Sequence, residues 1–200
     1  MEILAQEIAV QNIPPFVEFP SIARLSREIV VTEKIDGTNA QVHITEDGRM
    51  FAGSRSRWVN VGADNHGWAG WVTAHRDELM ALGAGSHFGE WWGSGIQRGY
   101  GLTKGEKRFS LFNVGRWITS EADRTNEKQE VAPACCSVVP ILHRGVFDTA
   151  QIEAVLTALA ATGSKASAGF MNPEGIVIYH EKSRTLFKRT LDGDGHKTAR

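Results

Sequence analysis

The sequence has few of the features that mark secreted or membrane-bound proteins. Only two of its 200 residues are cysteine, and Cys135 and Cys136 are adjacent, which suits neither an ordinary disulfide nor a four-ligand zinc site. No apolar run approaches the roughly 20 residues of a membrane span. Residues 1–16 contain acids, two prolines and no basic region, so they resemble neither a secretion signal nor a transit peptide. We expect a reduced, cytoplasmic setting and no membrane partner.

Net charge is also nearly absent, because 22 Lys and Arg residues face 23 Asp and Glu residues. A chain with this balance has no overall attraction for nucleic acid or for an anionic membrane, so any polyanion site must be a local patch. Scattered surface charge is the default interpretation of the basic residues. Six of them are nevertheless candidates for a phosphate-binding patch: Arg55, Arg57, Arg98, Lys104, Lys107 and Arg108.

Alternating apolar and polar residues indicate two β-hairpins. Residues 38–46 alternate and lead into Asp47-Gly48, a strong signal for a tight turn, so we expect the chain to return through residues 49–57. Residues 174–181 and 184–191 are typical of a second hairpin with its turn near Lys182.

Two segments carry the period of an amphipathic helix. Apolar residues spaced by three and four predict one helix from about Asp64 to Gly83, with its tryptophans in the core, and a second from Asp148 to Gly163. Further strands are expected at 86–92, 107–117 and 137–142, and residues 119–130 should form an exposed loop or a short surface helix. Hairpins interleaved with few helices indicate an α+β fold, not a doubly wound parallel sheet.

Several polar residues lie at strand ends or within strands, where a purely structural sequence would place few of them. A solvated strand face explains any one of them, but together they belong to an ordered series of short motifs: EKIDG at 33–37, GSR at 53–55, FGEWWG at 88–93, FSLFNVGRW at 109–117, EGIVI at 174–178 and LFKRT at 186–190. This series resembles motifs I, Ia, III, IIIa, IV and V of the covalent nucleotidyltransferases, the superfamily of RNA ligases, DNA ligases and capping guanylyltransferases. TEKIDGTN and FGEWWGSGIQRGYG are most similar to RNA ligases of the double-strand-repair type, which occur in phages and microbes.

The resemblance implies a fold, a reaction and partners. The fold would be a single α+β nucleotidyltransferase domain over residues 1–200, similar to the ATP-grasp type, with two antiparallel sheets, flanking helices and an ATP cleft between the sheets. No C-terminal accessory or OB domain is expected. The reaction would be ATP-dependent joining of RNA ends through a lysyl-AMP intermediate, with Mg²⁺ or Mn²⁺, in RNA repair. The partners would be RNA ends or a nicked duplex, with a separate protein supplying end binding; the oligomeric state stays open.

The chemistry of that reaction accounts for the residue types. Lysine is a suitable nucleophile for phosphorus because burial and nearby positive charge can remove its proton, whereas arginine stays protonated. Lys34 is the candidate nucleophile. Our hypothesis is that bound Mg²⁺ and Lys188 favour its neutral form and stabilise the transition state. Glu174 would be a metal ligand, since Mg²⁺ prefers carboxylate oxygen.

The remaining site residues are carried over from the same resemblance. Arg55 and Glu90 would hold the ribose, Phe112 would stack on the adenine, and Glu33 would lie beside its edge. Alternation places Phe112 on the strand face opposite Phe109 and Leu111. The sequence leaves open which of the two faces is in the core. Asn39 and Arg55 would position the nucleic-acid end.

One position departs from the family pattern. Motif V usually offers a second lysine two residues after the first, and Thr190 stands there after Lys188. Arg189 should point to the other face of the strand. The alternatives to an RNA ligase are a DNA ligase, a capping-type guanylyltransferase with the same lysine chemistry, and a non-catalytic module that binds nucleotide or nucleic acid.

Overall fold

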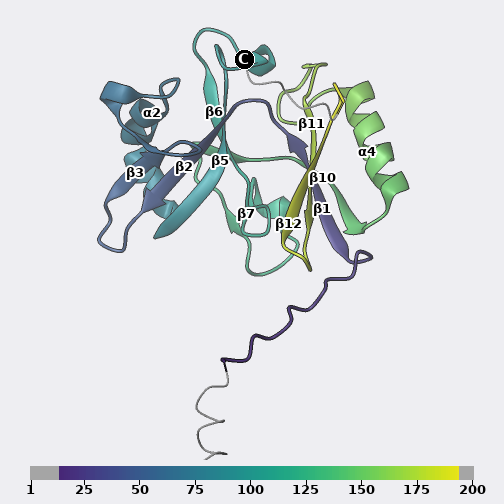
Figure 1. Cartoon of the computed structure of the whole chain (residues 1–200). Helices are drawn as coiled ribbons and strands as arrows, with labels where there is room; N and C mark the ends of the chain where they lie inside the picture. The colour runs from purple at the N-terminus through teal and green to yellow at the C-terminus, as the bar shows by residue number, and fades with distance from the viewer. Residues whose placement is uncertain (1–13, 194–200) are drawn as a thin grey trace, which may run out of the picture.

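The structure, a computed structural model, describes residues 14–193, and its strands form two large sheets and one small sheet (Figure 1). The antiparallel four-stranded sheet has the order β10-β1-β11-β12, from Ile141–Val146, Glu28–Lys34, Gly175–His180 and Thr185–Thr190. The six-stranded sheet has the order β4-β3-β2-β5-β6-β9, from Trp58–Val59, Met50–Gly53, Thr38–Ile44, Gly85–Gly93, Lys107–Leu111 and Cys136–Val138. The small sheet pairs β7 (Trp117–Ile118) with β8 (Glu130–Val131).

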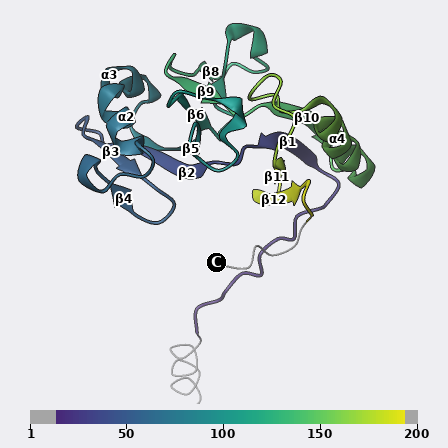
Figure 2. The same cartoon turned by 90° about the horizontal axis from the view of Figure 1, so that it is seen from above.

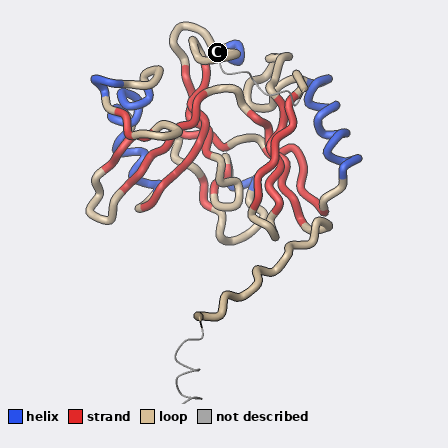
Figure 3. Tube along the Cα trace, in the orientation of Figure 1, coloured by secondary structure: helices blue, strands red, loops and turns tan. Residues whose placement is uncertain are grey.

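The expected α+β architecture is confirmed, with a difference in strand direction. Strands dominate the chain and the helices lie at its flanks (Figure 3). Two pairings are parallel, β6 with β9 and β7 with β8, whereas the sequence predicted antiparallel sheets throughout. Both parallel partners follow the long polar connection after β6, which is long enough to bring the chain back in the same direction.

Helices cover the outer faces of the two large sheets, so that the inner faces look toward each other (Figure 2). The helix α4, at Thr149–Thr162, packs its buried side chains Ile152, Leu156 and Leu159 on the outer face of β1 and β11. Its first turn is capped by Asp148, whose carboxylate accepts the backbone N–H groups of residues 150 and 151, and Gly163 ends it with φ of 77°. This helix and its ends are as predicted.

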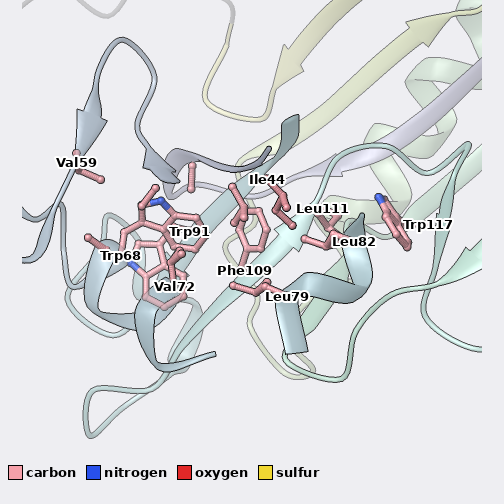
Figure 4. Packing of buried hydrophobic residues seen from close by; sticks show 14 of the residues in the cluster. Ile44, Val59, Trp68, Val72, Leu79, Leu82, Trp91, Phe109, Leu111 and Trp117 are labelled. Carbon is pink, nitrogen blue, oxygen red and sulfur yellow. The ribbon is translucent and has the colours of Figure 1, made fainter. Parts of the chain in front are cut away.

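The helical segment between residues 64 and 83 covers the outer face of the six-stranded sheet but is broken. It consists of α2 (Trp68–Ala74), α3 (Arg76–Leu79) and the 3-10 helix η2 (Met80–Leu82), whereas one continuous helix was expected. The break is at His75, whose backbone leaves helical values and whose ring stacks on Trp71 at 4.5 Å. Trp68 is fully buried against Trp91 and Phe109 in the core, as expected (Figure 4).

Two expected strands are shorter than the sequence suggested. Strand β6 ends at Leu111 because Asn113 starts a turn, accepting the backbone N–H of Arg116 on its side chain at 3.1 Å. The segment 137–142 divides at Pro140, which has no N–H to donate, and the chain there crosses from β9 in one sheet to β10 in the other. The remaining helical turns are short: η1 at Val61–Ala63, η3 at Gly99–Gly101 and η4 at Glu121–Asp123.

Candidate active site

A cavity of about 1010 Å³ lies between the inner faces of the two large sheets. Alternation along β1 explains its floor, since Val30, Thr32 and Lys34 line the cavity while Val31 packs toward α4. The opposite wall comes from β2, β5 and the turn after β6. The chain crosses from β1 to β2 at residues 35–37, so the first sequence motif lies where the two sheets meet.

Lys34 is the last residue of β1 and its amine lies against a carboxylate. Its Nζ donates to Oε2 of Glu174 at 2.5 Å, with side-chain exposures of 25% and 6%. Register explains the meeting, because Lys34 pairs with Gly175 of β11 and Glu174 immediately precedes that strand. This ion pair holds Lys34 in one position at the cavity wall.

Lys188 brings a second amine to the same cavity. It pairs with Val177 of β11, which pairs with Thr32 of β1, so the three side chains share the inner face of the sheet and all line the cavity. Arg189 points to the outer face as predicted and forms an ion pair with Glu153 of α4.

Thr190, the position of the departure in motif V, returns to the face of Lys188. It stands in one row with Gly175 and Lys34, and its hydroxyl donates to the carbonyl of Gly193 at 2.6 Å. A hydroxyl, not an amine, therefore occupies this position in the row that contains Lys34.

Glu90 lies across the cavity on β5 and is largely withdrawn from water. Its carboxylate accepts the backbone N–H of Gly37 at 3.0 Å and the side-chain amide of Asn39 at 3.5 Å. Burial raises the pKa of Glu90 to about 7, and the charges of Glu174 and Asp36 add to the rise, against Lys34 and the Gly37 N–H. A site with this much negative charge close together would be stabilised by a cation.

The raised pKa of Glu90 makes stability depend on pH in a defined direction. Between the ordinary glutamate pKa of 4.5 and about 7, the folded protein holds a proton that the unfolded chain has released, so the free energy of unfolding falls as pH rises through that window. Replacing Glu90 with glutamine removes the group. We expect the variant's fall between about pH 5 and pH 8 to be smaller by ~3 kcal/mol, measured by urea unfolding.

The exposed Glu127 provides the matched control, because Glu127→Gln removes a carboxylate from the surface. This variant is expected to keep the wild-type pH dependence. Equal pH dependence in Glu90→Gln and the wild type would show that Glu90 ionises normally in the folded protein.

Phe112 faces the cavity, which settles the alternative that alternation left open. Phe109 and Leu111 are 0% and 1% exposed in the core, whereas Phe112 is 40% exposed and lines the cavity. Its backbone N–H donates to the carbonyl of Phe88 at 2.9 Å, which extends the pairing of β6 with β5 beyond the end of the strand. A flat ring at this wall is suited to stacking on a base.

The loop between β1 and β2 is held by residues from the glycine-rich segment after β5. Arg98 donates to Asp36 at 3.1 Å and also to the carbonyl of Pro173 at 3.1 Å, immediately before Glu174. The hydroxyl of Tyr100 accepts the backbone N–H of Asp36 at 3.0 Å. Arg98 therefore fixes the loop after Lys34 and the segment before Glu174 relative to each other, a role that sequence reasoning missed although it named Arg98 as basic.

Gly37 is required in that loop by a close approach. A Cβ on it would lie 2.5 Å from the carbonyl oxygen of Trp91 and 2.8 Å from the Cβ of Trp92. Any larger residue would push the loop away from β5 and break its hydrogen bond to Glu90.

Glu33 belongs to the cavity lining, whereas Arg55 does not. The Glu33 carboxylate accepts the hydroxyl of Ser164 at 2.6 Å and the backbone N–H groups of Lys165 and Ala166 at 2.7 and 3.0 Å, and Glu33 is 1% exposed. Its predicted contact with the adenine edge remains a prediction. Arg55 lies in the exposed turn between β3 and β4, outside the cavity lining, at the end of the sheet where β2 begins and where Asn39 lies.

The basic residues that line the cavity differ from the six that the sequence named as candidates for a phosphate-binding patch around the site. None of those six belongs to the cavity lining within residues 14–193. Arg116 and Arg144 line it instead, beside Lys34 and Lys188. Arg144 reaches the cavity because it pairs with Val30 where β10 lies beside β1. No local sequence pattern predicts this long-range pairing.

The carboxylates of the site fit a divalent cation that is shared with phosphates. No group of three His, Cys, Asp or Glu side chains in the described part of the chain could hold a metal alone. Mg²⁺ usually takes one or two carboxylates together with substrate phosphates, so Glu174 and a phosphate are a sufficient donor set.

Among residues 14–193, no helix is long and apolar enough to cross a membrane. Cys135 and Cys136 are free thiols.

Comparisons with known proteins agree with the fold and with the sequence motifs. A family model described as RNA ligase matches residues 27–190. No curated protein matches the sequence. Similar solved structures include three mutants of Naegleria gruberi RNA ligase, each 20% identical over 84% of this chain: an apo form (TM-score 0.58, 50% of that chain), a form with AMP and Mn (0.56, 51%) and a form with ATP and Mn (0.58, 50%). This chain spans about half the length of the solved chains that it matches.

Proposed function

Because this chain belongs to the RNA ligase family, we propose that it is an ATP-dependent RNA ligase that works through a lysyl-AMP intermediate. One observation carries the proposal: the Lys34 amine, in contact with Glu174, opens onto a cavity that also holds Lys188, Glu90 and Phe112. A DNA ligase or a guanylyltransferase would use the same lysine chemistry, and a binding module would need none of it.

The first step attaches AMP to the enzyme. Lys34 Nζ attacks the α-phosphorus of ATP, a nitrogen–phosphorus bond forms, and the bond to pyrophosphate breaks as pyrophosphate leaves with the electron pair. Glu174 lies in contact with Nζ and can accept the proton that the amine loses. Lys188 adds positive charge that favours the neutral amine and stabilises the leaving pyrophosphate.

Two further steps complete the joining reaction. A 5′-phosphate oxygen attacks the phosphorus of the bound AMP, and Lys34 leaves and regains its proton. A 3′-hydroxyl then attacks the activated 5′-phosphate, a phosphodiester forms, and AMP departs. Phe112 would stack on the adenine, Glu90 would accept the ribose hydroxyls, and Asn39, hydrogen-bonded to Glu90, would contact the strand end.

A divalent cation would be held by Glu174 together with substrate phosphates, and Mg²⁺ or Mn²⁺ there would neutralise phosphate charge. The residues of the chain orient the reactants around it. The hydrogen bonds from Arg98 to Asp36 and to the carbonyl of Pro173 hold the loop after Lys34 and the segment before Glu174 in a fixed position relative to each other. We further propose that the protein acts in RNA repair in the cytoplasm and that a separate protein supplies end binding.

The sugar at the 3′-hydroxyl end tests the RNA ligase proposal against the DNA ligase. We expect a nicked duplex with ribonucleotides at the 3′-hydroxyl end to be sealed at least about tenfold faster than an all-DNA nick, because a site that contacts the 2′-hydroxyl rejects a strand without it. The measurement uses pre-adenylylated nicks with AMP-free protein at low salt, which isolates sealing from ATP binding.

Nicks that change only the sugar on the 5′-phosphate side are the control, and they should be sealed at similar rates. If all-DNA nicks are sealed as fast as nicks with ribonucleotides at the 3′-hydroxyl end, the protein is a DNA ligase and the RNA ligase proposal is wrong. Covalent transfer of GMP from GTP in preference to AMP from ATP would instead indicate a guanylyltransferase.

A further inference from the structure

Four aromatic side chains, three exposed and one half-buried, form a surface on the inner side of the six-stranded sheet that extends from the cavity. We call this surface the aromatic face, and it consists of His43, Phe51, Trp58 and Phe88 from β2, β3, β4 and β5. Phe51, Trp58 and Phe88 are 40%, 56% and 55% exposed. The register accounts for the grouping, since Phe51 pairs with His43, and Trp58 and Phe88 stand at the two ends of one row through Gly53 and Gln41.

The face is ordered by its own contacts. The ring centroids of Phe51 and Trp58 are 5.8 Å apart, and His43 lies 5.9 Å from Trp58. Gly53 leaves room for the indole, because a Cβ there would lie 3.1 Å from Cζ3 of Trp58. The ring of His43 and the amide of Gln41 each lie 2.9 Å from the Ser86 hydroxyl. These rings therefore present a preformed surface and would lose little freedom on binding.

The aromatic face is continuous with the cavity. Phe88 belongs to both, and its carbonyl accepts the backbone N–H of Phe112, the ring assigned to adenine. Ser86, which contacts His43, also lines the cavity. A strand whose end enters the cavity can therefore continue across β5 and β2 to β3 and β4.

Charge next to the aromatic face favours a polyanion. Arg55 and Arg57 lie in the turn between β3 and β4, beside Trp58, and both are exposed. Neither forms an ion pair with another residue between 14 and 193. The Arg49–Asp47 ion pair lies at the opposite end of the β2–β3 hairpin. Exposed rings with adjacent arginines are the combination that binds unpaired nucleic acid through base stacking and phosphate contacts.

We propose that the aromatic face binds unpaired bases of the polynucleotide strand whose end enters the cavity, with Trp58 and Phe88 as stacking platforms. This proposal rests on the proposed RNA ligase function, since it assigns the face to that enzyme's substrate. Each stacked base contributes to affinity whatever its identity, because every base has a π-face. The face therefore binds single-stranded flanks without reading their sequence.

The test compares binding of a fluorescently labelled single-stranded RNA with that of a blunt RNA duplex, by anisotropy at low salt. Trp58→Ala is expected to weaken single-strand binding by roughly tenfold and Trp58→Phe by much less, because phenylalanine keeps a stacking surface. Blunt-duplex binding should change little in either variant. Phe19→Ala, which removes a 79% exposed ring from the N-terminal segment, is the matched control and should bind as the wild type does.

Lysyl-AMP formation from ATP is measured on the same proteins, and Trp58→Ala should form it at the wild-type rate because Trp58 lies outside the cavity lining. If the wild type forms no lysyl-AMP but Trp58→Ala still loses single-strand binding, the proposed function fails and the aromatic face stands. Unchanged single-strand binding in a folded Trp58→Ala overturns the aromatic face as a nucleic-acid surface and leaves a protein partner as its occupant. An equal loss of duplex binding overturns the stacking of unpaired bases.

Discussion

Replacing Lys34 with alanine is expected to abolish covalent attachment of AMP to the protein. The amine of Lys34 is the group that lies against Glu174 and opens onto the cavity, and the variant has no nucleophile in its place. The measurement is retention of label from α-labelled ATP after denaturation. Lys34→Arg should be equally inactive, because a guanidinium keeps its proton and cannot attack phosphorus.

Sealing of pre-adenylylated nicks provides a second readout for the same variants. It does not require AMP transfer from the lysine, so a folded Lys34→Ala should retain part of this activity, whereas an unfolded one would lose it. Lys128→Ala removes an exposed lysine outside the cavity lining and should take up AMP as the wild type does. Undiminished labelling of Lys34→Ala would place the nucleophile elsewhere.

Replacing Glu174 with alanine is expected to lower AMP transfer by roughly 100-fold or more, the scale of removing one group that stabilises charge in the transition state. Its carboxylate is the contact of the Lys34 amine and the proposed metal ligand, so the substitution removes both roles. Excess chelator should stop AMP transfer by the wild type as well, and added Mg²⁺ or Mn²⁺ should restore it. Single-turnover labelling at several metal concentrations measures both effects.

Glu174→Gln separates the charge from the shape of the side chain. It keeps the volume of a buried residue, so thermal unfolding should change less than in Glu174→Ala while AMP transfer stays low. The surface variant Glu127→Gln should transfer AMP normally. Wild-type rates in Glu174→Gln, together with full activity in chelator, would exclude the assigned role.

Local signals in the sequence were sufficient for the hairpins and for α4. The turn at Asp47-Gly48 and the alternation before it specify β2 and β3, because register follows once the turn and the buried face are known. The Asp148 cap and Gly163 likewise define both ends of α4. These elements depend on residues close together in the chain.

Interruptions within an otherwise continuous apolar pattern were less predictable. The helix break at His75 accompanies stacking on Trp71, and β6 ends where Asn113 turns the chain, although the apolar pattern continues through both positions. Pro140 was included in one expected strand, but the chain there moves from one sheet to the other. Periodicity describes which residues share a face and does not report where a stacked ring, a turn residue or a change of sheet interrupts an element.

The site residues likewise divide into those that the sequence predicted and those that it did not. Ordered motifs predicted Lys34, Glu90 and Lys188, because each motif carries its residue in a recognisable neighbourhood. Arg144 and the ties made by Arg98 were missed, since they depend on strand order and on a loop far away in sequence. The face of Phe112 also required the structure, because alternation fixes only which residues lie on opposite sides.

The most direct test of the lysyl-AMP chemistry is mass spectrometry of the protein after incubation with ATP and Mg²⁺, first intact and then as peptides. The proposed mechanism predicts a lasting gain of one AMP per chain, carried by the peptide that contains Lys34. No gain with either Mg²⁺ or Mn²⁺, or AMP carried on any other residue, would contradict it.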